Sequence, residues 1–405
     1  MRTGVSVMVW AAVAGPLACA PKLRAGEVAE VRASLDEGRA GGGGIDLAVG
    51  RVLGLGAPIA GAQTPGLSLE LLVTEHGFSG LALDVDATAA RALDAFVNGA
   101  EVDVDAALTG LGEPGLASRE MRTLLLWMRA YNLQQPFYPQ GQPHPMAPGY
   151  VPSANEGAVV RRVRVFGLDP RDGDAAAAVV LAYFDRVDPA YVATARSLLA
   201  GGVQLGVEAV LQRLDDRREA YAKGDAAAWV DARQQAEVTA QARRMAETWE
   251  FEAREFARAR NAEWALAQLD GGKLLVMADN RQVAAEVPGA APSMGNFIKQ
   301  WLGADYRAFG AIYTGGQVRG EGCSVTLIEV EEGSFEAALA GLNGGWIDLR
   351  GRTGLWVRPQ RIGGETLRPA LAFDGLWVVP QVEPATPLDP RCGAHEAASR
   401  DATKP

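Results

Sequence analysis

Short apolar segments alternate with helix-forming segments along most of this chain, and that alternation most constrains its fold. Segments typical of amphipathic helices, such as Arg119–Asn132, separate the apolar ones. Strands separated by helices form a mostly parallel sheet with helices on both faces. We therefore predict an α/β fold. The segments that predict buried strands are Ile45–Leu55, Gly80–Val85, Val163–Leu168, Lys273–Ala278, Tyr306–Tyr313, Trp346–Leu349 and Leu376–Val379.

One helix-forming stretch is too long to be a simple crossover between two strands. Residues 174–269 contain a single proline, Pro189, and a dense mixture of charges. This pattern predicts a long helical hairpin subdomain, inserted at about residues 188–269, whose charged face is solvated. We expect the part from Asp225 to Leu269 to form one long helix.

The N-terminus has the features of an export signal. Arg2 precedes the apolar run Val5–Ala14, which is too short to span a bilayer. Gly15-Pro16-Leu17-Ala18-Cys19 resembles a bacterial lipobox, although leucine usually stands three residues before the cysteine. We expect an exported lipoprotein of the bacterial cell envelope, lipidated at Cys19 and in contact with the membrane only through this anchor. The alternatives are plain cleavage near Ala18 or Ala20, or an unprocessed N-terminus.

The remaining organisation follows from composition. Residues 1–20 are the predicted signal, 21–44 a glycine-rich linker, 45–380 the α/β domain and 381–405 a disordered tail. Two cysteines remain, Cys323 and Cys392. They either pair, which would join the tail to the body, or stay as two free or buried thiols.

Charge and motif content exclude several functions. Lysine and arginine total 39 against 49 acidic residues, a formal net charge of −10, so we expect no nucleic-acid partner. The sequence contains no Cys-x-x-Cys metal motif, P-loop or Gly-x-Ser-x-Gly elbow, and we expect no bound cofactor or metal.

An ordered series of short motifs resembles the erythromycin esterase family, which opens macrolide lactones. The series extends from about Ile45 to Leu349. The resemblance implies the same α/β fold and a cleft at the carboxyl ends of the strands. Its members are Val52-Leu53-Gly54-Leu55-Gly56, Glu75-His76-Gly77-Phe78, Ala82-Leu83-Asp84-Val85-Asp86, Trp127-Met128-Arg129-Ala130-Tyr131-Asn132, Phe166-Gly167-Leu168-Asp169, Asn261-Ala262-Glu263-Trp264, Met294-Gly295, Leu302-Gly303-Ala304-Asp305-Tyr306 and Ile347-Asp348-Leu349-Arg350.

The chain departs from this family at the residues that the resemblance would make catalytic. Active relatives have Gly-Glu-x-x-His-Gly after the first strand, where the histidine activates water and the glutamate orients it. Ala57 and Ala60 stand at those two positions here. Relatives also have Ala-His-Asn-x-His after a later strand, where Asp279 and Gln282 replace the histidines. Water needs a base that titrates near neutrality, so these replacements predict impaired catalysis.

The acidic residues of the predicted cleft are retained. Asp84, Asp86 and Asp169, with Asp279, fall at or just past strand ends. They could bind a metal, a cation or a sugar, or do acid–base chemistry when one pKa is raised. The alternative is that they cap helices and tie loops.

None of the three histidines is a clear replacement for the lost base. His76 precedes the second strand and so lies away from the cleft, while His395 is in the predicted tail. His144 lies in a proline-rich loop that could fold over the cleft. We expect structural or solvent-facing roles for all three.

Three functions stay open. The first is a non-catalytic or impaired family member that binds a small-molecule ligand. The second is a diverged hydrolase of ester or lactone bonds that uses aspartates and a metal. The third is an envelope lipoprotein whose helical hairpin docks a protein partner.

Overall fold

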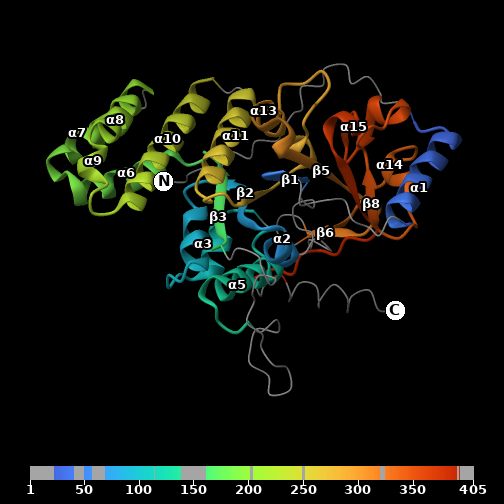
Figure 1. Cartoon of the computed structure of the whole chain (residues 1–405), viewed down its shortest axis with the longest axis horizontal. Coiled ribbons are helices and arrows are strands. Elements are labelled where there is room, and N and C mark those ends of the chain that lie inside the picture. Colours follow the sequence, from blue (N-terminus) through green and yellow to red (C-terminus); the bar gives the residue numbers. More distant parts are fainter. Residues whose placement is uncertain are drawn as a thin grey trace, which may run out of the picture.

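The computed structural model describes residues 22–40, 50–56, 69–113, 115–137, 161–200, 204–248, 251–319, 324–389 and Cys392. At its centre is a seven-stranded sheet of order β3-β2-β4-β1-β5-β11-β8 (Figure 1). All neighbouring strands are parallel except β11 and β8, which are antiparallel. The predicted α/β fold is therefore confirmed. The strands are β1 Val52–Gly56, β2 Phe78–Asp86, β3 Arg164–Asp169, β4 Lys273–Ala278, β5 Tyr306–Tyr313, β8 Gly345–Asp348 and β11 Gly375–Val379.

Helices cover both faces of this sheet, and an apolar core lies between the sheet and the helices on each face (Figure 1). Apart from the edge strand β8, the strands are mostly buried along both faces, which explains why their sequences are nearly continuous apolar runs. One face packs against α1 Ala25–Ala40, α11 Phe251–Ala267, α13 Met294–Leu302, α14 Phe335–Leu339 and α15 Pro369–Ala372. The other packs against α2 Leu69–His76, α3 Ala90–Val97, α4 Val104–Gly110 and α5 Arg119–Leu133.

A helical subdomain extends from the β3 end of the sheet and has its own core (Figure 1). Its core includes Phe184 and Trp229, and α10 packs on α6 and α8. The predicted single helix over Asp225–Leu269 is wrong: α10 belongs to this subdomain, whereas α11 packs on the sheet. Its helices are α6 Gly173–Val187, η1 Pro189–Tyr191, α7 Val192–Ala200, α8 Gln204–Asp216, α9 Arg218–Tyr221 and α10 Ala226–Thr248.

Several short elements were not predicted. Helix α12, Asn280–Val283, follows β4 directly, and the 3-10 turns η2 Gly303–Asp305 and η4 Gly354–Val357 follow α13 and β8. Two small antiparallel pairs flank the sheet: β6 Gln317–Arg319 with β7 Val325–Leu327, and β9 Gln360–Ile362 with β10 Glu365–Leu367.

The predicted linker over residues 21–44 is wrong for the part that the structure describes. Ala25–Ala40 is helix α1, and its Val31 and Leu35 are fully buried against the sheet domain. Leu23 N also donates to Gly333 O at 2.9 Å. The four-residue spacing of these two apolar side chains places both on one face of the helix.

The predicted disordered tail is also wrong over residues 381–389. Val382 N donates to Gly315 O, and Leu388 N donates to Ala117 O, so the segment pairs with two loops of the body. Cys392 is disulfide-bonded, which rules out a free thiol there; its partner and Cys323 lie outside the described residues. Residues 393–405 lie outside them too.

No described helix has both the length and the apolar character that a membrane span requires.

The docked α1 generates a test of the fold. Leu35→Ala should lower the free energy of unfolding by about 2–5 kcal/mol, because it leaves a cavity under a fully buried side chain. Urea denaturation followed by circular dichroism measures the change. Ala33→Ser on the exposed face of the same helix is the control and should cost under about 1 kcal/mol. Equal effects of the two substitutions would mean that the helix does not pack on the domain.

Candidate functional site

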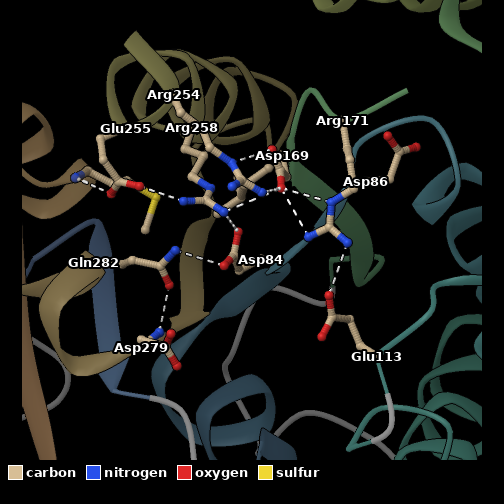
Figure 2. Close-up of polar contacts among 12 residues, drawn as sticks. Asp84, Asp86, Glu113, Asp169, Arg171, Arg254, Glu255, Arg258, Asp279 and Gln282 are labelled. Atoms are coloured by element: carbon tan, nitrogen blue, oxygen red, sulfur yellow. Dashed lines mark hydrogen bonds and ion pairs between the residues drawn. The ribbon is translucent and has the colours of Figure 1, made fainter. Parts of the chain in front are cut away.

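The carboxyl ends of β2 and β4 are joined by a glutamine from α12. Gln282 Nε2 donates to Asp84 Oδ2 at 2.8 Å, and Asp279 N donates to Gln282 Oε1 at 2.9 Å (Figure 2). Parallel topology places Asp84 and Asp279 on neighbouring strands, as the sequence predicted. The residue at the second family histidine position thus holds two polar groups of the edge together.

Arg258 of α11 lies among three carboxylates. Its Nη2 atom is 2.8 Å from Asp84 Oδ1 and 3.3 Å from Asp169 Oδ2, while Nη1 donates to Glu255 (Figure 2). Only 5% of its side chain is exposed. Glu255 Oε2 in turn accepts from Met294 N at 3.0 Å, which fixes the start of α13. Burial raises the pKa of Glu255, with Arg258 acting against that shift.

Asp169, at the end of β3, is surrounded by arginines. Besides Arg258, its carboxylate contacts Arg171 at 3.1 Å and Arg254 through both oxygens. Burial alone would raise the pKa of this fully buried carboxyl, but the arginines outweigh burial and the pKa is lowered. Asp169 is therefore ionised, and its charge is neutralised locally.

Asp86 ties loops together. Its Oδ1 accepts from Thr88 N at 2.9 Å and Ala89 N at 2.7 Å, and its Oδ2 accepts from Asp172 N at 2.8 Å. These bonds join the end of β2 to the segments that precede α3 and α6. This is the loop-tying arrangement that the sequence left open.

Asp279 differs from the other acids because its side chain is exposed to solvent. No ion pair to its carboxylate is present among the described parts of the chain. Desolvation by the surrounding protein raises its pKa first, and the nearby charges of Asp84, Glu113 and Glu365 raise it further, with Arg258 opposing them. A carboxyl of this kind binds a proton more readily than an ordinary aspartate.

Asn280, next to Asp279, joins two strands across a glycine. Its side chain donates to Ala311 O at 2.7 Å and accepts from Ala311 N at 2.8 Å, so it bridges to β5. The side chain crosses the end of β1 at Gly56, where a Cβ would lie 1.9 Å from Asn280 Oδ1. Gly56 is therefore required for this close approach.

The other predicted site residues lie elsewhere. His76 ends α2, at the amino end of β2 and away from the carboxyl edge. Five residues fall outside the described part of the chain: Cys19, Ala57, Ala60, His144 and His395.

Metal binding by the retained acids has no geometric support in the described residues, where no three His, Cys, Asp or Glu side chains are placed to hold an ion. The Arg258 guanidinium lies between Asp84 and Asp169, where a shared cation would have to lie. These acids fit an arginine rather than a divalent ion.

The arginines are the part of the site that sequence reasoning missed. The charges of residues 225–269 were interpreted as a solvated face, but Glu255 and Arg258 are buried at the carboxyl edge. The available signal was the spacing of Arg254 and Arg258, which puts two cations on one side of a helix.

The fold and the position of these polar residues define an α/β protein with a candidate site beyond the carboxyl ends of its parallel strands. The family described as erythromycin esterase matches residues 73–382, so the chain belongs to the erythromycin esterase family. No curated protein matches the sequence significantly.

Solved structures show the same fold. A Bacillus cereus protein superposes with a TM-score of 0.67 at 19% identity, over 83% of this chain and 90% of that one. A succinoglycan biosynthesis protein gives 0.64 at 18% identity, over 83% and 89%. A mutant of the erythromycin esterase EreC in its open conformation gives 0.59 at 16% identity, over 84% and 92%.

The buried ion cluster generates a stability prediction. Arg258→Met should lower the free energy of unfolding by about 3–5 kcal/mol, because Glu255, Asp84 and Asp169 lose a shared buried cation. Urea denaturation at pH 7 measures the loss. Arg260→Met, two residues along α11 in an exposed pair with Glu263, is the control and should cost under about 1 kcal/mol. A loss no larger for Arg258 than for Arg260 would contradict the cluster.

Proposed function

We propose that this member of the erythromycin esterase family binds a small-molecule ligand at the carboxyl edge of its sheet and does not hydrolyse esters by the family's histidine route. The observation that carries this proposal is the pair Asp279 and Gln282 at the family's histidine positions. Gln282 cannot accept a proton from water near neutral pH, and its amide already bonds Asp84 and Asp279.

The other acids are poor substitutes for a general base. Asp169 has a lowered pKa and is enclosed by arginines, so it has little tendency to accept a proton. Asp84 is occupied by Arg258 and Gln282, and Asp86 by three backbone amides. Ala57 and Ala60 offer no titrating group at the family's first loop. The same edge still presents the exposed carboxyl of Asp279 as a polar contact for a ligand.

Hydrolysis assays test the proposal. Erythromycin and p-nitrophenyl acetate incubated with the purified chain between pH 5 and 9 should show turnover indistinguishable from buffer, with an active esterase as positive control. Mass spectrometry of the lactone and absorbance of nitrophenol provide the readouts. Turnover that Asp279→Asn abolishes would reject the proposal.

A diverged hydrolase is the second candidate, and one observation favours it. Asp279 combines solvent exposure with a raised pKa, which are the properties of an aspartate able to exchange protons in acid–base catalysis. In that case activity would follow the ionisation of Asp279 and disappear in Asp279→Asn. The assays above therefore separate the two candidates.

We also propose export and lipid attachment at Cys19. Helix α1 begins at Ala25 and Leu23 already bonds Gly333, so an anchor at Cys19 would hold the domain by a tether of few residues. Docking of a protein partner on the helical subdomain stays a prediction.

Metabolic labelling tests the anchor. Cells that express the full chain and are fed a radiolabelled or alkyne-tagged palmitate should yield a labelled band in the membrane fraction. Cys19→Ser should lose the label, whereas Cys323→Ser should retain it. Label that persists in Cys19→Ser would exclude this site of attachment.

A further inference from the structure

Two carboxylates at this edge have no ion pair among the described residues, Asp86 and Asp279. Asp86 is satisfied by three backbone N–H groups, whereas Asp279 is exposed to solvent. Asp84 pairs with Arg258, Asp169 with Arg254, Arg171 and Arg258, and Glu113 with Arg171 at 3.1 Å. Asp279 contacts none of these arginines closely enough for an ion pair, although its side chain is open to solvent. Asp279 is therefore the carboxylate of this group that has neither an ion pair nor a set of backbone donors like that of Asp86 in the described structure.

The groups around Asp279 reinforce that lack of an ion pair. Asp84 from β2, Glu113 from the segment before α5 and Glu365 from β10 all act on it as like charges. Arg258 from α11 is the opposing charge, but it is shared among Asp84, Asp169 and Glu255. Gln282, the neighbouring polar group of α12, is neutral. A cation placed at Asp279 would be attracted by the whole group.

Tyr313 provides an independent sign that a ligand belongs here. It is the last residue of β5 and is 5% exposed, and its hydroxyl is buried with no hydrogen-bond partner among the described residues. Buried hydroxyls are nearly always paired, so an unpaired one needs an explanation. Burial and the charge of Asp279 both raise the pKa of Tyr313, which keeps the phenol neutral.

The topology places the two side chains on one face of the sheet, near enough for the charge of Asp279 to act on Tyr313. Asp279 follows β4 and Tyr313 ends β5, and in the described sheet β1, Val52–Gly56, lies between these two strands. Met277 and Tyr313 both pack on the core under α2 to α5, and alternation along the extended chain puts Asp279 on the same face as Met277. Asn280, the residue after Asp279, connects the end of β4 to β5 through its two hydrogen bonds with Ala311.

We propose that Asp279 and Tyr313 together bind an ammonium group of the ligand, with N–H donors directed to the Asp279 carboxylate and to the phenol oxygen. This inference rests on the proposed ligand-binding function and names the chemical class of the ligand, an organic amine in its protonated form. The ammonium supplies the missing positive charge and gives the Tyr313 hydroxyl oxygen a partner.

Calorimetric titration with n-butylammonium chloride, and with n-butanol as a neutral analogue of equal length, tests the site in the purified chain. We expect butylammonium to bind at one site and butanol at least about tenfold more weakly. Asp279→Asn should weaken butylammonium by about tenfold or more. Tyr313→Phe should weaken it severalfold without lowering the unfolding temperature, because the removed hydroxyl is unpaired.

Asp216→Asn, an exposed acid of the helical subdomain, removes the same net charge far from the site and should leave binding unchanged. Equal binding of butanol, equal effects of Asp279→Asn and Asp216→Asn, or stoichiometric binding of Ca²⁺ or Mg²⁺ that Asp279→Asn abolishes would overturn the inference. Butylammonium has no hydrolysable bond. Ester turnover would thus reject the proposed function without affecting this result, and failure of the titration would leave the hydrolysis result intact.

Proton linkage adds a second readout. The raised pKa of Asp279 means that its ionised form is disfavoured in the free folded protein. Asp279→Asn should therefore raise the unfolding temperature at pH 7, and this gain should vanish as the pH falls below about 4, where the folded and the unfolded aspartate are both protonated. Butylammonium affinity should fall over the same acidic range. A purely structural Asp279 predicts the opposite, a lower unfolding temperature for Asp279→Asn at pH 7.

Discussion

The buried guanidinium of Arg258 is the interaction on which the carboxyl edge of this sheet depends. It joins Asp84 of β2, Asp169 of β3 and Glu255 of its own helix, and Glu255 continues the connection to the first residue of α13. Two strands and two helices are thus held by one cation. This buried charge is costly to remove, because Asp84 and Glu255 would lose their positive partner in a medium of low polarity, while Asp169 would keep Arg171 and Arg254.

The sheet was predictable because its strands are buried on both faces and so appear as nearly continuous apolar runs. Helix α1 and the segment 381–389 were not, and the reason is the same for both. Each is polar and rich in small residues or proline, and each is ordered by contacts with distant parts of the chain, as Trp356 Nε1 contacts Glu30 and Arg119 N contacts Thr386. The local composition of a segment does not indicate which residues far away in the sequence it will contact.

The candidate site also has a part that the sequence predicts and a part that it does not. Topology alone places Asp84, Asp169 and Asp279 at one edge, because parallel strands end on the same side. Their partners could not be read from the sequence. An arginine pair at i and i+4 has the same pattern on a solvated helix and on a buried one, and only the packing of α11 against the sheet decides that Arg258 is buried. Likewise, nothing in the sequence distinguishes Asn280 from an ordinary loop residue. Its role becomes clear only from its close approach to Gly56 in the structure.

The arginines also explain why one acid at this edge differs from the rest. Asp84 and Asp169 already have arginine partners that neutralise their charge, so both are poor ligands for an incoming positive group. Desolvation and the neighbouring like charges raise the pKa of Asp279 because they destabilise its ionised form. The like charges would favour any cation that binds this carboxylate, whether a proton or an ammonium ion. A proton and an ammonium ion therefore compete for the same carboxylate, and the interactions that destabilise the empty site are those that an amine ligand would relieve. A ligand that binds Asp279 in the folded protein and not in the unfolded chain raises the free energy of unfolding. Ligand affinity and protein stability are therefore linked at this site.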